Sequence, residues 1–201
     1  MTEGPTRTRG RRVSFTERRE RRAAIDDPAV VHDAALRFLE SRSRSVAEVR
    51  RRLSTAGYRK ELVDGAISRL IGLALLDDTA FASAWVASRD RAHPRGENAL
   101  RRELQLKGIE RQVIDGVLED RRADLPVEAA TSGGSADAAA AVRLLERKGR
   151  ALSRIADPRV RRQRAYTLLA RHGFDPGVSG DAASAWAGSL TDDPEGDPPV
   201  V

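Results

Sequence analysis

Apolar residues recur at three- and four-residue intervals over most of the chain, and this spacing predicts helices. Three segments share one pattern, in which a Leu stands four residues before a Gly and an apolar residue directly follows that Gly. The glycines are Gly57, Gly108 and Gly173. A Gly just past a helix adopts the left-handed conformation at low cost, and the apolar residue after it packs back on the last turn. The pattern therefore predicts a helix, a glycine stop and a second helix, repeated three times.

Each of these helix pairs has a further amphipathic segment before it, so the predicted unit contains three helices. These segments lie at 30–41, 79–92 and 136–150. Capping signals mark two of the expected helix starts. Ser45 and Glu48 form a capping-box pattern, and Asp157 precedes a Pro at the first helical position. A further capping-box pattern at Ser14 makes residues 14–25 helical, or ordered on a partner.

The apolar stripes predict the core of each unit. In the second unit Asp120 interrupts the stripe, and we expect the neighbouring Leu118 to fill that face. Phe81, Ala84 and Trp85 follow one another at helical spacing and are expected in the core as well. The remaining core positions are Val49, Leu53, Tyr58, Leu62, Ala66 and Leu70 in the first unit, Leu100, Leu104, Ile109, Val113 and Val117 in the second, and Ala165, Leu169, Phe174, Val178, Ala182 and Trp186 in the third.

The spacing of the glycines locates a linker. The interval from Gly108 to Gly173 exceeds the interval from Gly57 to Gly108 by the length of segment 123–136, which is rich in Pro, Gly and Ser. We therefore predict an all-α fold: an elongated tandem array of three three-helix units, similar to helix-turn-helix repeats, with disordered termini. An ordinary helical bundle is the alternative. The predicted parts are a basic arm that is disordered or partly helical (1–24), repeat 1 (25–76), repeat 2 (77–122), a flexible linker (123–136), repeat 3 (137–190) and an acidic disordered tail (191–201).

Four stretches together resemble one known family. They are SRSRSVAEVRRRL (41–53), LLDDTAFASAWVASR (75–89), RGENALRRELQLKGI (95–109) and RAYTLLARHGF (164–174). Their combination is similar to the RecX family, regulators that bind the RecA recombinase, over roughly residues 31–187. The arm before residue 25 and the insertion at 123–136 depart from the family pattern. The resemblance implies a modulator of RecA–DNA filaments that mostly inhibits recombinase, ATPase and coprotease activity.

Composition and charge narrow the class of protein. The chain has no Cys, which excludes disulfides and thiolate metal sites, and its N-terminus lacks the apolar core of a signal peptide. With no long apolar run either, we expect a cytoplasmic protein. The net charge is +6. Residues 1–24 carry eight Arg against three Glu, and residues 191–201 carry four acidic residues and no basic one. This distribution favours a polyanionic partner, although solubility alone is a second explanation.

No arrangement typical of catalysis or cofactor binding is found. The three histidines, His32, His93 and His172, lie in different predicted units without metal-ligand spacing. The chain contains neither a G-x-S-x-G nucleophile motif nor a glycine-rich phosphate-binding motif. We therefore expect a binding protein, with no enzymatic activity, metal or cofactor.

The basic residues are the remaining candidates for function. We expect contacts with RecA, its nucleoprotein filament, and single- or double-stranded DNA, made by a protein that is a monomer. With few aromatic residues available for base stacking, phosphate contacts would dominate. The candidates are Arg50, Arg51, Arg52, Arg95, Arg101, Arg102, Lys107, Arg111, Lys148, Arg161, Arg162 and Arg164. The alternatives are a helix-turn-helix-like protein that binds DNA without RecA, and a helical adaptor for another acidic protein.

Overall fold

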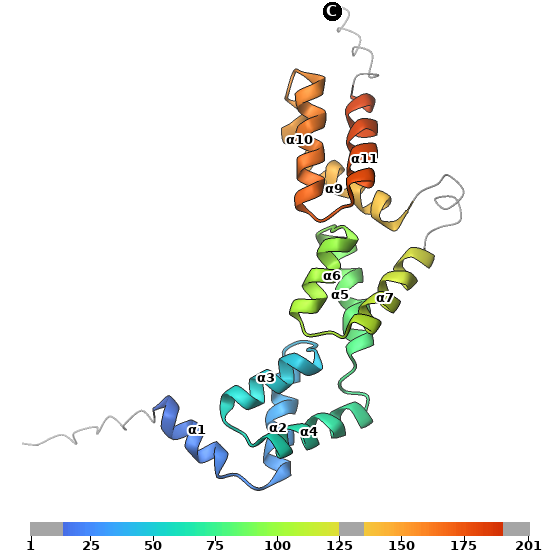
Figure 1. Cartoon of the computed structure of the whole chain (residues 1–201). Helices are drawn as coiled ribbons and strands as arrows, with labels where there is room; N and C mark the ends of the chain where they lie inside the picture. The colour runs from blue at the N-terminus through green and yellow to red at the C-terminus, as the bar shows by residue number, and fades with distance from the viewer. Residues whose placement is uncertain (1–13, 125–134, 191–201) are drawn as a thin grey trace, which may run out of the picture. The chain divides into compact units, whose positions relative to one another are not determined.

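The computed structural model describes residues 14–124 and 135–190, which form ten α-helices and no strand (Figure 1). The prediction of an all-α fold is thereby confirmed. The chain divides into two compact units, Met1–Asp77 and Asp78–Val201. The predicted tail at 191–201, most of the predicted linker and the first half of the arm lie outside the described residues.

The first unit consists of one short helix and a three-helix repeat. Its helices are α1 (Phe15–Ala23), α2 (Pro28–Leu39), α3 (Val46–Ala56) and α4 (Lys60–Gly72). The predicted capping box at the start of α3 is present, because Ser45 and Glu48 each accept the other's backbone N–H. The apolar faces of α2, α3 and α4 then meet in one core, built mainly from Val31, Val49, Leu53, Val63, Ile67 and Leu70.

Helix α1 belongs to the arm and lies against the end of α3. Its capping box at Ser14 and Glu17 is formed as expected. Arg22 donates to the backbone carbonyl of Ala56 over 3.4 Å, and its guanidinium lies 5.8 Å from the ring centre of Tyr58. No residue of α1 is buried. The helix is therefore held to the repeat by polar and cation–π contacts rather than by a core of its own.

The second unit contains the other two predicted repeats. Repeat 2 is formed by α5 (Asp78–Ala92), α6 (Glu97–Leu106) and α7 (Arg111–Ala123), and repeat 3 by α9 (Ala136–Ser153), α10 (Pro158–Arg171) and α11 (Pro176–Ser189). Each repeat has its own apolar cluster, centred on Leu100, Leu104 and Leu118 in repeat 2 and on Leu145, Leu169 and Phe174 in repeat 3. Leu118 fills the face interrupted by Asp120, as expected. Ala84 is exposed, contrary to the prediction, because it points away from the core face that Phe81 and Ala82 share.

The three glycine stops adopt the same conformation. Gly57, Gly108 and Gly173 have φ angles of 104°, 77° and 84°. In each case the glycine N–H and the N–H of the following apolar residue donate to carbonyls of the preceding helix's last turn. The apolar residue after the glycine, for example Ile109 or Phe174, packs into the core of its repeat. The predicted helix–glycine–helix unit is therefore confirmed at all three positions.

Candidate interaction surface

Repeats 1 and 2 share an arginine–aspartate pair that joins their second and third helices. Arg50 Nη1 lies 3.2 Å from Asp64 Oδ1, and Arg101 donates to Asp115. In both repeats the Arg stands seven residues before the glycine stop and the Asp seven residues after it. The hydrogen bond from Arg101 lowers the pKa of Asp115, and the one from Lys60 lowers the pKa of Asp64. The side chains of Arg50 and Arg101 are thus engaged within their own repeats.

Two further candidates lie over aromatic rings. The Arg52 guanidinium is 5.7 Å from the ring centre of Phe38, and Lys107 Nζ is 4.8 Å from that of Trp85. The indole N–H of Trp85 donates to Glu103 over 2.8 Å. These cation–π contacts orient the two basic side chains. A contact of this kind contributes about 0.5–1 kcal/mol at an exposed site.

Arg95 and Arg111 are held by carboxylates. Arg95 Nε lies 3.7 Å from Glu103 Oε1, and Arg111 Nε lies 3.6 Å from Asp115 Oδ2. The side chain of Arg111 is nevertheless 87% exposed. An exposed pair of this kind is weak, so Arg111 stays accessible to a partner.

Arg51 and Arg102 differ from Arg50 and Arg101 because no carboxylate pairs with either in the described part of the chain. Both are exposed. Each stands six residues before the glycine stop of its repeat, on the outward face of α3 or α6. The two repeats therefore each present an exposed arginine without a carboxylate partner at the same position of the same helix.

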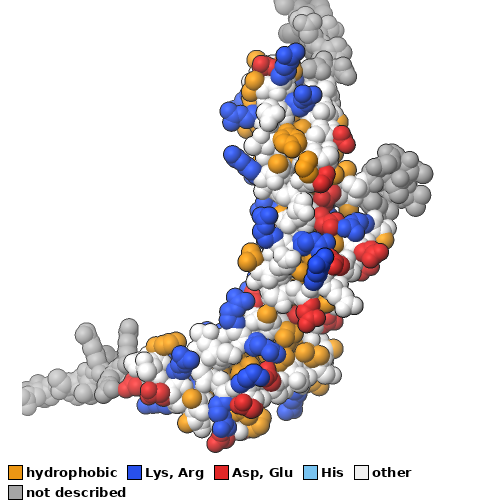
Figure 2. Space-filling model, viewed as in Figure 1, with side chains coloured by type: hydrophobic (Ala, Val, Ile, Leu, Met, Phe, Trp, Pro, Cys, Tyr) orange, Lys and Arg blue, Asp and Glu red, His pale blue; other side chains and the backbone are white. Residues whose placement is uncertain are grey.

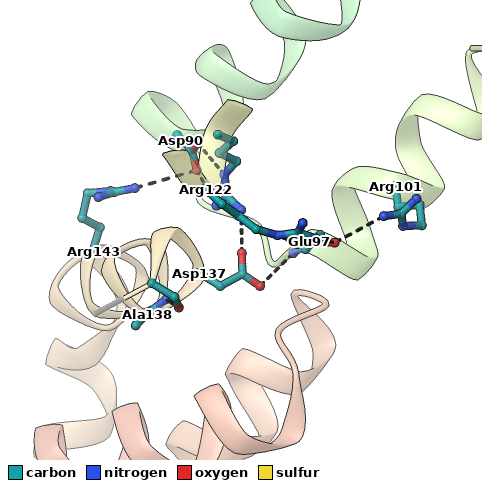
Figure 3. A network of polar contacts seen from close by, with 9 residues as sticks. Asp90, Glu97, Arg101, Arg122, Asp137, Ala138 and Arg143 are labelled. Atoms are coloured by element: carbon teal, nitrogen blue, oxygen red, sulfur yellow. Dashed lines mark hydrogen bonds and ion pairs between the residues drawn. The ribbon is translucent and has the colours of Figure 1, made fainter. Parts of the chain in front are cut away.

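A polar network in the second unit joins repeat 2 to repeat 3 (Figure 3). Arg121 donates to both carboxylate oxygens of Asp90, over 2.9 and 3.0 Å, and to Asp137 Oδ1 over 2.6 Å. The other oxygen of Asp137 accepts the backbone N–H of Glu97 over 3.0 Å. Asp137 thereby caps α6, whose N-cap residue Gly96 has no side chain to do so.

The arginine at the centre of this network is well buried. Only 7% of the Arg121 side chain is exposed. Burial by itself would lower the pKa of Arg121, but its hydrogen bonds to Asp90 and Asp137 raise it. We did not expect this network from the sequence. Its members lie on both sides of segment 125–134, and no helical spacing relates residues across such a gap.

The basic candidates of repeat 3 differ from one another in burial. Arg161 is 7% exposed and donates to the carbonyls of Ile155 and Ala187, so it supports the packing of α10 on α11. Lys148, Arg162 and Arg164 are exposed, and none of them forms an ion pair among the described residues. Burial leaves Arg161 without an accessible guanidinium face, whereas the other candidates remain available.

The charges of repeats 2 and 3 differ accordingly. Residues 77–122 hold nine Lys and Arg against nine Asp and Glu, whereas residues 137–190 hold ten against five. Helix α10 contains five Arg and no acidic residue. Figure 2 shows Lys and Arg side chains gathered over α10. The positive charge of the body is therefore concentrated in repeat 3 rather than spread evenly from repeat to repeat.

Two classes of site are not found in the described ranges. In residues 14–124 and 135–190, no group of three or more His, Asp or Glu side chains is placed to hold a metal ion. Among the helices described, none is long and apolar enough to cross a bilayer.

Comparisons with known proteins agree with this architecture. A family model described as "RecX, first three-helix domain" matches residues 32–70, and one described as "RecX, second three-helix domain" matches residues 77–118. The regulatory protein RecX of Mycolicibacterium vanbaalenii is 32% identical over 151 residues, which are 75% of this chain and 78% of that protein. The RecX protein of Chlorobium phaeobacteroides is 32% identical over 152 residues, which are 76% of this chain and 90% of that protein.

Solved structures share the fold. The crystal structure of RecX from Lactobacillus salivarius has a TM-score of 0.64 and 20% identity, covering 80% of this chain and 96% of that one. The helices and their glycine stops define a class, the all-α proteins built from tandem three-helix units. Within that class, the chain belongs to the RecX family of regulatory proteins.

Proposed function

We propose that this protein binds RecA and RecA–single-stranded DNA filaments and restrains their recombinase, ATPase and coprotease activities. One observation supports the proposal above the others: Arg51 and Arg102 are exposed, unpaired and equivalent in two successive repeats. A filament is a repeating polymer, so repeated contacts suit it. Several modest contacts made at once give useful affinity if the geometry allows them to form together.

The neighbouring arginines strengthen this argument. Arg50 and Arg101 hold the second helix of each repeat against the third through Asp64 and Asp115. The backbone that carries the outward arginine is thereby fixed in both repeats. A side chain attached to a fixed backbone loses less conformational entropy on binding, which favours a specific docked complex. Occupation of a RecA filament in this way would impede ATP turnover and the entry of duplex DNA.

The test is the ATPase activity of RecA on single-stranded DNA, titrated with the wild-type protein and with R51E/R102E. We expect wild type to inhibit, and the variant to need at least about tenfold more protein for the same inhibition, since reversed charges repel an acidic surface. The matched control is R69E/R91E, which reverses one exposed arginine per repeat at positions that the repeats do not share. It should inhibit like wild type.

Two results would contradict the proposal. In the first, wild type leaves RecA ATPase and strand exchange unchanged at saturating concentration. In the second, the protein binds duplex DNA tightly and selectively without RecA, which is the behaviour of the helix-turn-helix alternative. The acidic residues Glu61, Asp64, Asp115 and Glu119 on α4 and α7 make those helices poor readers of DNA, so we do not expect the second result.

A further inference from the structure

The ion pair that joins the second and third helices of repeats 1 and 2 has no counterpart in repeat 3. The residue seven positions before Gly173 is Tyr166, where the other repeats have Arg50 and Arg101. The residue seven positions after it is Gly180, where they have an aspartate. Both members of the pair are replaced, so α10 and α11 are not joined at this point by any charged contact.

Two hollows lie along the seam between α10 and α11. One hollow of about 200 Å³ is lined by Tyr166, Gly180, Arg162 and Ser184, among others. A second, of about 290 Å³, is lined by Arg159, Arg162, Ser184 and Gly188 together with Pro158 and Ala187. The two hollows share Arg162 and Ser184. A Cβ atom built on Gly180 meets nothing within 4 Å. The floor of the seam is thus formed by small residues that allow close approach.

The electrostatics of the seam are equally distinct. No carboxylate lines either hollow among the described residues. Arg159 and Arg162 are exposed and form no ion pair in the part of the chain that the structure describes. Arg164 adds a further unpaired charge on the same helix. In the other two repeats the equivalent seam carries a neutralising aspartate.

We propose that the seam between α10 and α11 binds the phosphodiester backbone of a nucleic acid, with Arg159 and Arg162 contacting successive phosphates. Arginine presents a planar fork of N–H donors that matches phosphate oxygens, and the Ser184 hydroxyl adds a donor on the opposite helix. The inference rests on the proposed function, because a protein bound to the RecA filament would meet the single-stranded DNA that the filament holds.

The composition of the seam favours nucleic acid over an acidic protein surface. Stable protein interfaces need aromatic or large apolar anchors at their centre. Here α11 contributes only Gly, Ala and Ser to the lining, and Tyr166 is the one aromatic residue among it. Phosphate contacts need no such anchor, because affinity comes from the release of counterions.

The experiment measures binding of the full chain to a fluorescent thymidine oligonucleotide by anisotropy, over a series of salt concentrations. R159Q/R162Q should bind about tenfold or more weakly, and the slope of log K against log salt should fall by about 1.4, near 0.7 per lost contact. Its control is R69Q/R91Q, which removes one exposed arginine from each of the other repeats and should keep the wild-type slope.

A second variant adds a carboxylate to the seam instead of removing its arginines. G180D places a carboxylate where the other repeats have one, in open space beside Arg162. It should weaken oligonucleotide binding severalfold. G116D adds the same charge to α7, again where a Cβ meets nothing within 4 Å, and should bind like wild type. Thermal unfolding followed by circular dichroism verifies that each variant is folded. Equal slopes for R159Q/R162Q and wild type, or equal losses in G180D and G116D, would overturn the inference.

Further arms separate the possible partners and the two proposals. Duplex DNA of the same length shows which form of the backbone fits, and binding of labelled polyglutamate as tight as that of the oligonucleotide would overturn the assignment to phosphate. If wild type fails to inhibit RecA but R159Q/R162Q still loses oligonucleotide binding, the proposed function fails and the seam assignment stands. If R159Q/R162Q keeps oligonucleotide binding yet no longer inhibits RecA, the seam contacts protein and the inference is wrong.

Discussion

Repeats 2 and 3 share a scaffold but differ in their polar residues. Both have Leu four residues before the glycine stop, a left-handed glycine and an apolar residue after it, and these positions build equivalent cores. Repeat 2 holds most of its arginines in intramolecular pairs, such as Arg101–Asp115 and Arg121–Asp90. Repeat 3 leaves Arg159 and Arg162 unpaired. The comparison teaches that packing fixes only the apolar and glycine positions, so the outer residues are free to specialise.

The shared scaffold gives the largest expected effect. Leu104 and Leu169 are both 0% exposed and occupy the same position of their repeats. Replacing either with Ala should cost about 2–5 kcal/mol through lost burial and the cavity left behind. The chain has two tryptophans, Trp85 in repeat 2 and Trp186 in repeat 3, so single-tryptophan backgrounds report urea unfolding of each repeat separately.

The control for this prediction is Leu106→Ala. Leu106 is 74% exposed on α6, two residues from Leu104, and its replacement should change the free energy of unfolding by less than about 0.5 kcal/mol. The prediction is contradicted if L169A lowers the free energy of unfolding by less than about 1 kcal/mol while L104A lowers it by the expected amount of about 2–5 kcal/mol. The alanine-rich core of repeat 3 would then not depend on Leu169.

The junction between the repeats gives an intermediate effect. Replacing the buried Arg121 with Gln leaves Asp90 and Asp137 without their shared partner, so we expect a loss of about 2 kcal/mol, below the value for a fully buried pair because both carboxylates retain some exposure. Both tryptophan signals should report it, since the network joins both repeats.

The adjacent residue supplies the control. Arg122 also forms an ion pair, with Glu97, but its side chain is 54% exposed. R122Q should therefore change stability by no more than about 0.5–1 kcal/mol. Equal effects of R121Q and R122Q would mean that burial of the arginine does not set the strength of this junction.

The sequence predicted the scaffold well because helical spacing, capping and glycine stops are local signals. The capping boxes at Ser14 and Ser45 and the turn at Gly108 depend on residues within a few positions of one another. The polar contacts were not predictable in this way. Arg121 and Asp137 meet across a segment that no periodicity bridges, and Arg161 stands among exposed arginines in sequence while its guanidinium is buried against α11.

The same limit applies to the candidate surface. The sequence identified the basic residues, and Arg51 and Arg102 are exposed, as contact with a partner requires. It did not indicate that Arg50 and Arg101 are paired across the helices, because each aspartate lies fourteen positions from its arginine. Only the folded hairpin brings such residues together. The repetition of the pair at equal distances from the glycine is a signal that a comparison of the repeats could have used.

The smallest expected effect concerns that pair in repeat 2, which repeat 3 lacks. The hydrogen bond from Arg101 lowers the pKa of Asp115. A carboxylate whose pKa is lowered by folding stabilises the protein above its unfolded pKa, near about 3.9, and this stabilisation is lost as the pH falls through the folded pKa. Wild type should therefore unfold at slightly higher urea than D115N at pH 6, and the difference between the two midpoints should shrink as the pH falls below about 3.9 toward pH 3.

This difference should appear in the Trp85 signal and be absent from the Trp186 signal, because the pair lies within repeat 2. Comparing wild type with D115N at each pH removes the titration of all other groups, which the two proteins share. A difference that stays constant or widens toward pH 3 would mean that Asp115 does not act through its charge. In that case Asp115 would act in repeat 2 only as a hydrogen-bond acceptor. Repeat 3 has no aspartate at the equivalent position and still forms its three helices.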